Sequence, residues 1–394
     1  MISGFLSSCR IVSPLNDVIQ HDKFLAKIAA DSSYKVQIIY TSVNVKDSFF
    51  HTYQFHVHEQ AYFYPASTVK LPIAILALQK LNELKSQYPK IDKECIFLSD
   101  SSRPSQRAAL IDTTHSSGQP TIRRYIEKIF LVSDNDAYNR LYEFLGQEYI
   151  NNELKERFPE SNFAINHRVG VSGFNFEENR YTNPVRFICN GAITYQQTEK
   201  RSQIAYKHQS NNAILGRGFI NSSDSLVLHP FDFTEKNFVP LPMLHDMLER
   251  ILFPELFPEH QRFNLTEADY SFLKNAMFAL PKSDPFYRQD TSLYDSYVKF
   301  IMFGDSKENI PDDIRIYNKV GDAYGFLTDV AYIENKTKGI GFFLSANILC
   351  NQDEIFNDGI YEYDSIGLPF LSRLGQKIYS LEEKRAKKQN KHQK

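Results

Sequence analysis

Apolar residues recur at helical spacing in several segments that polar stretches separate. Residues 121–132 place isoleucine, tyrosine and phenylalanine three or four positions apart, which predicts an amphipathic helix. Residues 71–78 are almost entirely apolar, which indicates a buried central helix. Further helices are expected at residues 15–30, 137–145, 239–252, 266–279 and 364–384.

Runs rich in β-branched and aromatic residues lie near both ends of the chain and predict strands. These runs cover residues 36–43, 50–57, 314–319, 327–333 and 340–348. The last three follow one another closely, as antiparallel strands do. We therefore expect an α+β fold in which one antiparallel sheet, built from both chain ends, is flanked by helices.

The distribution of these elements predicts two lobes. Residues 10–60 and 296–383 would form a discontinuous α/β lobe, and residues 61–295 a helical lobe. An insertion is expected at about 185–240, either as a lid beside the site or as a neutral surface elaboration. Residues 384–394 form a basic tail with six Lys or Arg and no acid. A cleft between two lobes is a natural place for an active site.

Composition narrows the class of protein further. The 394 residues are 42% hydrophobic, and 45 basic residues balance 47 acidic ones. A chain of this kind is expected to be globular, and no run of 18 apolar residues predicts a transmembrane span. The near-neutral balance gives no reason to expect nucleic acid as a partner.

The first chemical motif combines Ser67 and Lys70 at the start of the apolar run 71–78. Residues three apart share a helix face, so the Lys70 amine can reach the Ser67 hydroxyl. Free backbone N–H groups at a helix start also lie close to that oxygen. The same S-x-x-K pattern begins at Ser32, Ser271 and Ser296, without such an apolar helix. The motif alone is therefore weak evidence.

The second motif, Ser133-Asp134-Asn135, falls where the helix predicted at 121–132 ends. Asp and Asn at such a point often serve only as helix caps and turn formers. A further serine and an amide next to a Ser–Lys pair are also what acyl transfer through serine requires. The third motif decides whether Ser133-Asp134-Asn135 is only a helix cap or part of a catalytic site.

That motif is Lys-Val-Gly at residues 319–321, which ends a predicted strand. Tyr-Gly at 324–325 and Asp-Val-Ala at 329–331 follow it. With the first two motifs in the same order, this pattern resembles class A β-lactamases, in the superfamily of β-lactamases and penicillin-binding proteins. The resemblance runs from about residue 62 to 331 and implies a β-lactamase-like fold with a serine hydrolase site.

The chemistry assigns roles to three catalytic candidates. Ser67 is the nucleophile, and Lys70 is the general base that removes its proton. Lys70 can do so only when it is neutral, which requires burial or a nearby positive charge such as that of Lys319. Ser133 would then act as general acid and protonate the departing nitrogen.

The remaining candidates bind substrate. Asn135 offers an amide to a substrate carbonyl, and Lys319 and Gly321 belong to the substrate-binding strand. The resemblance further implies an oxyanion hole formed by the backbone N–H groups of Ser67 and Asp322. We expect neither a cofactor nor a metal ion.

Two residues depart from the family pattern. Val320 stands where relatives carry a hydroxyl that grips a substrate carboxylate. Gly170 stands two positions after Arg168, where the family places its deacylating glutamate. Glu177 and Glu178 are the nearby candidates to replace it. The site is therefore predicted to form an acyl-enzyme, with the deacylation of that intermediate in doubt.

The function predicted is a serine hydrolase that acts on a β-lactam or a related amide through an acyl-enzyme. The alternatives are a penicillin- or peptidoglycan-binding or sensor protein without turnover, and a D-amino-acid peptidase or esterase. The partner is accordingly a small-molecule amide or lactam, or a cell-wall peptide. Oligomeric state is left open.

The four cysteines contain no C-x-x-C pair, so they give no support to a metal site. Leu6-Ser-Ser-Cys9 resembles a bacterial lipobox, although five preceding residues are too few for a signal sequence. Export is favoured, because cell-wall peptides and β-lactams are met outside the cytoplasm. We therefore expect a periplasmic location, with a lipid anchor at Cys9 if the true start lies upstream. Disulfide pairing is left open.

Overall fold

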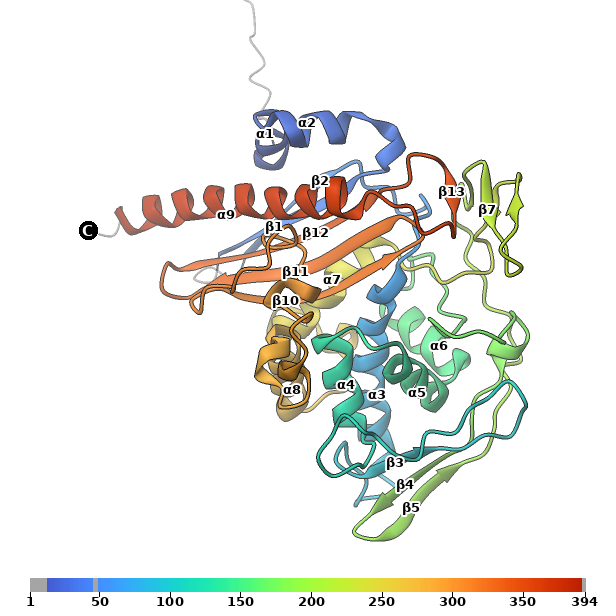
Figure 1. Ribbon diagram of the computed structural model, residues 1–394. Coiled ribbons are helices and arrows are strands. Elements are labelled where there is room, and N and C mark those ends of the chain that lie inside the picture. The colour runs from blue at the N-terminus through green and yellow to red at the C-terminus, as the bar shows by residue number, and fades with distance from the viewer. Residues whose placement is uncertain (1–12, 45–48, 392–394) are drawn as a thin grey trace, which may run out of the picture.

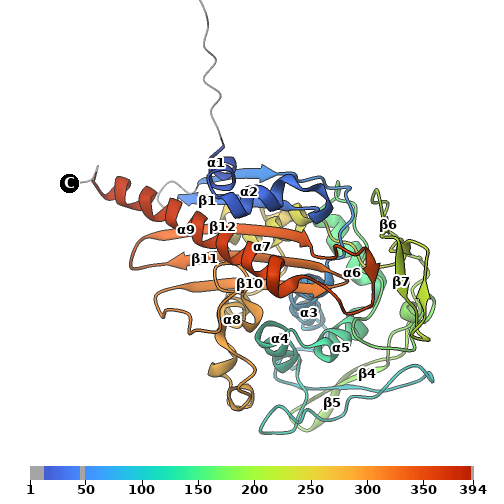
Figure 2. The same cartoon turned by 45° about the horizontal axis from the view of Figure 1, so that its top comes forward.

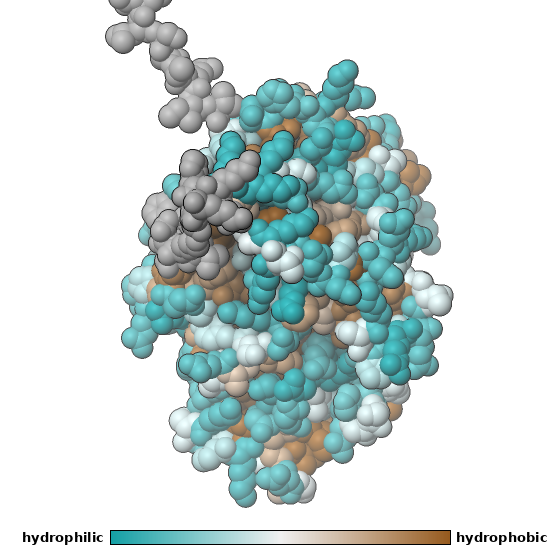
Figure 3. Space-filling model, turned by 90° about the vertical axis from the view of Figure 1, so that its left-hand side faces the viewer, coloured by the Kyte–Doolittle hydropathy of each residue, from teal (hydrophilic) through white to brown (hydrophobic). Residues whose placement is uncertain are grey.

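The computed structural model describes residues 13–44 and 49–391 (Figure 1). The predicted lipobox, which ends at Cys9, lies outside the described residues. Among the residues described, no helix is both long enough and apolar enough to cross a membrane. On the face shown in Figure 3, hydrophilic residues cover much of the surface, and apolar residues form only small groups.

A five-stranded antiparallel sheet contains strands from both ends of the chain, in the order β10-β11-β12-β1-β2 (Figure 2). Strand β1 pairs with β12, so the two ends of the chain meet inside the sheet. The bounds are β1 Gln37–Asn44, β2 Phe49–Phe55, β10 Arg315–Ala323, β11 Phe326–Asn335 and β12 Ile340–Leu349. The predicted α+β fold with a sheet from both chain ends is confirmed.

Both faces of this sheet are covered by helices. One face is covered by α1 (Pro14–Gln20), α2 (Lys23–Ala30) and α9 (Leu368–Lys391), and the other by α3 (Lys70–Leu84) and α7 (Leu241–Leu252) (Figure 1). Ile38 packs in the core beneath α9, whereas Ile39 packs with α3 and α7, because successive side chains of a strand point to opposite faces. All residues of β12 are buried, which explains its nearly unbroken apolar sequence.

Two predicted helices have different bounds in the structure. The helix expected at 15–30 is two helices, α1 Pro14–Gln20 and α2 Lys23–Ala30. Asp22 separates them because its carboxylate accepts hydrogen bonds from the first backbone N–H groups of α2. The last helix begins later than expected, and α9 runs from Leu368 to Lys391 into the basic segment.

The helical part surrounds α3, in which every residue from Lys70 to Leu81 is buried. This confirms the buried central helix that the apolar run predicted. Neighbouring helices are α4 Ile122–Leu131, α5 Asn135–Leu145, α6 Gln147–Arg157, α7 Leu241–Leu252 and α8 Glu267–Phe278. Short 3-10 turns lie at Ser32–Tyr34, Ala66–Val69, Glu178–Arg180, Pro254–Leu256, Glu259–Gln261, Pro281–Ser283, Tyr287–Gln289 and Asp295–Val298.

The segment expected as an insertion consists of short strands. Its first two strands, β4 and β5, pair with β3 in a three-stranded sheet. A disulfide between Cys95 and Cys189 links the start of β3 to the end of β4. Farther along, β7 pairs in parallel with β13, which ties the segment to the C-terminal part of the chain (Figure 1). The bounds are β3 Ile96–Ser99, β4 Val185–Cys189, β5 Ala192–Gln197, β6 Ile214–Leu215, β7 Gly218–Ile220, β8 Leu226–Val227, β9 Phe231–Asp232 and β13 Ile355–Phe356.

Candidate active site

A cleft of about 750 Å³ lies where the start of α3, the start of α5 and the edge strand β10 meet. Ser67, Ser133, Asn135 and Asp322 all line it. Lys70 and Lys319 lie directly behind this surface and are buried. The structure therefore brings together residues from three distant parts of the sequence.

Ser67 lies on the 3-10 turn Ala66–Val69, and the α-helix proper begins three residues later. The Thr68 hydroxyl donates to the Pro65 carbonyl at 2.6 Å and closes the turn. Ala66 has a φ of 46°, a left-handed conformation that is uncommon for a residue other than glycine. The Ser67 hydroxyl forms no hydrogen bond within the described part of the chain and faces the cleft, where it is free to meet a ligand.

The Lys70 amine is held by the loop that carries the second motif. It donates to the Asn135 side-chain oxygen at 2.7 Å, to the Ser133 hydroxyl at 3.2 Å and to the Ser133 carbonyl. A hydrogen bond to Ser67 is not among its contacts in the described residues. Burial lowers the pKa of Lys70 to about 7, although the charges of Asp134 and Asp322 act in the opposite direction. Part of the Lys70 population is therefore neutral near pH 7, as a general base requires.

Lys319 reaches the same hydroxyl from the opposite side. Its amine donates to the Ser133 hydroxyl and to the Val320 carbonyl, each at 2.8 Å. Burial and the neighbouring Lys70 hold the pKa of Lys319 well below its usual value. The Ser133 hydroxyl thus lies between two amines, one of which can give it a proton while the other accepts one.

Gly321 lets strand β10 lie directly against the turn that carries Ser67. A Cβ atom at this position would lie 2.6 Å from the Pro65 carbonyl oxygen and 2.9 Å from the Ser67 backbone nitrogen. Only glycine permits so close an approach without a shift of the backbone. The backbone of β10 at Gly321 therefore lies directly beside the backbone nitrogen of Ser67. The oxyanion hole predicted at Ser67 and Asp322 would form where these two segments meet.

The start of α5 positions the second motif. The Asp134 carboxylate accepts a hydrogen bond from the Ala137 backbone N–H at 2.7 Å and caps the helix. Ser133, which precedes this cap, has a φ of 55°. The capping role considered for this motif is therefore real for Asp134, and it places Ser133 and Asn135 at the cleft.

Gly170 packs against Asn135 and leaves no space for a side chain. A Cβ atom there would lie 2.3 Å from the Asn135 amide nitrogen, and the φ of Gly170 is +59°. The preceding residues are held firmly, because the buried Arg168 donates to Glu143 at 3.0 Å and Asn139 bonds the backbone of Val169. Relatives carry a glutamate at this position. Here the Asn135 amide takes the space that a side chain at position 170 would need.

The two nearby glutamates are bonded elsewhere. Glu178 pairs with Arg103 at 2.8 Å and accepts from Ser105, which hold the pKa of Glu178 at about 2. Glu177 pairs with Arg180 and Arg201. Neither glutamate lines the cleft. The structure gives no support to the idea that one of them activates water at Ser67.

Several aromatic residues line the cleft, and of these only Tyr324, in the pattern after the third motif, is marked in the sequence. Five tyrosines and one phenylalanine contribute to its walls: Tyr64, Tyr294, Tyr297, Phe300, Tyr324 and Tyr363. Asp329, part of the pattern after the third motif, fixes one of these walls. Its carboxylate accepts from the backbone N–H groups of Phe300 at 3.1 Å and Ile301 at 3.0 Å.

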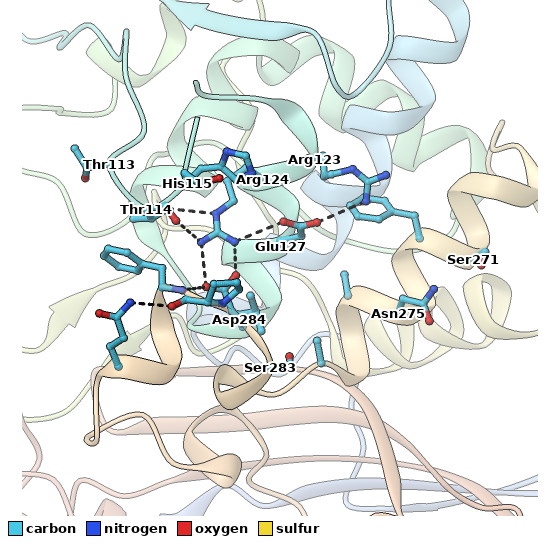
Figure 4. Close-up of a pocket in the computed structure, with 18 of the residues that line it drawn as sticks. Thr113, Thr114, His115, Arg123, Arg124, Glu127, Ser271, Asn275, Ser283 and Asp284 are labelled. Atoms are coloured by element: carbon cyan, nitrogen blue, oxygen red, sulfur yellow. Dashed lines mark hydrogen bonds and ion pairs between the residues drawn. The ribbon is translucent and has the colours of Figure 1, made fainter. Parts of the chain in front are cut away.

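A second pocket of about 890 Å³ lies between α4 and α8 (Figure 4). Its charged side chains pair with one another: Arg124 contacts Asp284 at 2.5 Å and Glu127 at 3.6 Å. Residues 13–44 and 49–391 contain no group of three His, Cys, Asp or Glu side chains placed to hold a metal ion. The smaller cleft at Ser67 is therefore the candidate active site.

Comparisons with known proteins agree with this fold. Residues 21–185 match a family model described as the beta-lactamase enzyme family. PBP-A is similar at 13% identity with a TM-score of 0.53, over 94% of this chain and 98% of that one. The extended-spectrum β-lactamase TLA-1 is similar at 12% identity and a TM-score of 0.51, over 93% of this chain and 99% of that one.

A β-lactamase from Desulfarculus baarsii DSM 2075 is similar at 12% identity and a TM-score of 0.50, again over 93% of this chain and 99% of that one. No curated protein matches the sequence. At such identities these likenesses establish a shared fold, and the roles of individual residues must be argued from this chain's own geometry.

Proposed function

We propose that the chain belongs to the β-lactamase and penicillin-binding-protein superfamily and that, within it, it is a serine acyl-transfer hydrolase that forms an acyl-enzyme at Ser67. Its substrate is a β-lactam or a related amide. The observation that carries this proposal is the Ser133 hydroxyl, held between the amines of Lys70 and Lys319 beside Ser67.

In the acylation step, neutral Lys70 accepts the proton of Ser67 as the serine oxygen attacks the substrate carbonyl carbon. The developing oxyanion accepts hydrogen bonds from the backbone N–H groups of Ser67 and Asp322. The carbon–nitrogen bond then breaks, and Ser133 gives its proton to the departing nitrogen. Lys70, which holds the proton taken from Ser67, returns that proton to Ser133, while Lys319 orients the Ser133 hydroxyl.

Deacylation is proposed to be slow. Gly170 provides no carboxylate, and Glu177 and Glu178 are paired with arginines away from the cleft. Without a carboxylate at position 170, or from Glu177 or Glu178, to activate water, the ester at Ser67 persists. This feature favours the second candidate function, a penicillin- or peptidoglycan-binding or sensor protein that is acylated without rapid turnover.

The test is a time course with a chromogenic cephalosporin, combined with the intact mass of the protein. We expect one adduct per chain with little steady turnover, and no adduct in Ser67→Ala. Ser271→Ala is the matched control, because Ser271 begins another S-x-x-K sequence on an exposed helix face. That variant should be acylated at the same rate as the unaltered protein.

Other outcomes of this test are informative. Rapid turnover abolished by Ser67→Ala would contradict slow deacylation while supporting the hydrolase. Absence of both adduct and turnover would exclude β-lactams and leave peptides or simple esters to be examined by the same mass measurement.

An extracytoplasmic location is also part of the proposal. Cys95 and Cys189 form a disulfide, a bond that persists in oxidising compartments such as the periplasm. The same compartment contains the cell-wall peptides that would acylate the serine of a site of this class.

A further inference from the structure

The charged side chains on the surface of the Ser67 cleft are all acidic. They are Asp134, Asp322 and Asp364. Asp134 is occupied as the cap of α5, whereas Asp322 and Asp364 form no hydrogen bond or ion pair with the residues that the structure describes. The two lysines of the site lie behind the surface, with their amines turned to Ser133.

Asp322 is the acid closest to the reaction machinery. It follows Gly321 on β10, and its backbone N–H belongs to the proposed oxyanion hole. Its side chain is exposed, yet the walls of the cleft desolvate it enough to raise its pKa, while Lys319 and Lys70 lower it. Neither lysine comes within ion-pair distance of it in the described residues, so this carboxylate lacks a partner.

The surroundings of Asp322 are unsuitable for an anion. Val320, two positions earlier on the same strand, has no hydroxyl to donate to a substrate carboxylate. The Lys319 amine is already bonded to Ser133 and to the Val320 carbonyl. A substrate carboxylate in this part of the cleft would meet the charge of Asp322 with no donor to offset the repulsion.

The same surroundings suit a cation. Tyr297 and Tyr363 line the same cleft as Asp322. Burial raises the pKa of each phenol, and the charge of Asp322 raises it further. Aromatic faces attract ammonium and guanidinium groups, and a carboxylate next to them adds direct charge complementarity. An unpaired acid beside tyrosine rings is an arrangement that recognises an organic cation.

We propose that Asp322 is a specificity-determining residue that selects substrates with a cationic group on the leaving-group side and disfavours those with a carboxylate there, so that a cephalosporin, whose carboxylate lies beside the lactam nitrogen, acylates Ser67 more slowly than a substrate with a cation in that place. This inference rests on the proposed acyl transfer at Ser67. The leaving-group side is assigned because Asp322 lies on the strand whose Lys319 holds Ser133, the proton donor to the leaving group.

The test uses three thioesters of acetate that share one chain length and differ only at the end of the thiol. One ends in trimethylammonium, one in a neutral tert-butyl group and one in a carboxylate. Release of the thiol in the first turnover reports acylation of Ser67 even when deacylation is slow. We expect the cationic thioester to acylate the protein about tenfold faster than the anionic one, with the neutral one between them.

Variants separate the charge of Asp322 from its position in the fold. Asp322→Asn should reduce the ratio of cationic to anionic rates to about twofold or less, whereas Asp322→Glu, which keeps the charge, should preserve a preference for the cation. Glu160→Gln removes one exposed negative charge outside the cleft and should leave the ratio unchanged. A preference that depends on Asp322 should also weaken as salt is raised.

The outcomes distinguish this inference from the function on which it rests. If Ser67 is acylated by the neutral thioester but the three rates are equal, or if Asp322→Asn keeps the full preference, Asp322 is not the determinant. If no thioester gives thiol release or a mass adduct that Ser67→Ala removes, the proposed acyl transfer itself is wrong.

Discussion

Asn135 is contacted from two sides, by the Lys70 amine at 2.7 Å and by the backbone of Gly170, and these two sides are built very differently. The first side gathers two buried lysines and a serine hydroxyl within hydrogen-bond distance. The second side packs a glycine against the amide and excludes any side chain. The Lys70 side is thus equipped to move protons during acylation, whereas the Gly170 side offers no carboxylate for deacylation.

This difference shows that the two halves of a hydrolytic cycle can be separated in one fold. The proposed acylation step depends on groups that are hydrogen-bonded to one another, since the Lys70 amine donates to both Ser133 and Asn135. The deacylation half depends on one carboxylate in a neighbouring loop. Replacement of that carboxylate by Gly170 leaves the network around Ser133 intact.

The largest effect is expected from Lys70→Met, which removes the general base. Acylation should fall by about 10²- to 10⁴-fold, measured as the rate of adduct formation by intact mass. Lys80→Met is the matched control, because Lys80 is a second buried lysine of α3 with a pKa lowered to about 7, bonded to the Phe144 carbonyl. It should reduce stability without slowing acylation, and equal losses in both variants would contradict the role of Lys70.

Gly321→Ala tests the approach of β10 to the Ser67 turn. The new methyl group would collide with the Pro65 carbonyl and the Ser67 backbone nitrogen, so the oxyanion donors should be displaced. A misplacement of this kind is expected to slow acylation by about 100-fold. Gly118→Ala is the control, since nothing lies within 4 Å of the added methyl, although its φ of +67° is unfavourable for alanine. Normal acylation in Gly321→Ala would show that the close approach is not needed.

Gly170→Glu tests whether the missing carboxylate can simply be restored. The new side chain would meet Asn135, and the φ of +59° is unfavourable for it, so we expect acylation to slow by about tenfold with no gain in turnover. Gly173→Glu lies in the same loop, with a φ of +87° and open space around it, and should leave both rates unchanged. Rapid cephalosporin turnover by Gly170→Glu would show that the loop tolerates the family's arrangement.

The smallest effect concerns pH. Lys70 has a pKa lowered to about 7 and acts in its neutral form, so acylation should rise as pH increases through 7. Between pH 6 and pH 8 the neutral fraction grows about tenfold, and the first-turnover rate should follow it. A rate that is flat over this interval would indicate that Lys70 is not the group that titrates in the acylation step.

Much of the fold and the chemical core of the site could be predicted from the sequence. The strands and most helices follow from local periodicity, and the motifs at Ser67, Ser133 and Lys319 identify residues that the structure brings together at one cleft. The break at Asp22 was missed, because a polar residue in the middle of an apolar pattern is read as the exposed face of one helix. Apart from Tyr324, which belongs to the pattern after the third motif, the tyrosine walls were also missed, since no local pattern marks a tyrosine that lines a cleft.

The sequence by itself determined the order of the three motifs, the sheet shared by both chain ends and the absence of a glutamate at Gly170. Only the tertiary structure decided which groups meet. Lys70 and Ser133 are 63 residues apart, and Lys319 and Ser133 are 186 apart, so their contact depends on how α3, α5 and β10 pack. The tertiary structure also placed Glu177 and Glu178 outside the cleft. It left the Asp322 carboxylate without an ion-pair partner among the residues described. Periodicity and turn chemistry act over a few residues, whereas burial and charge pairing arise where distant elements pack together.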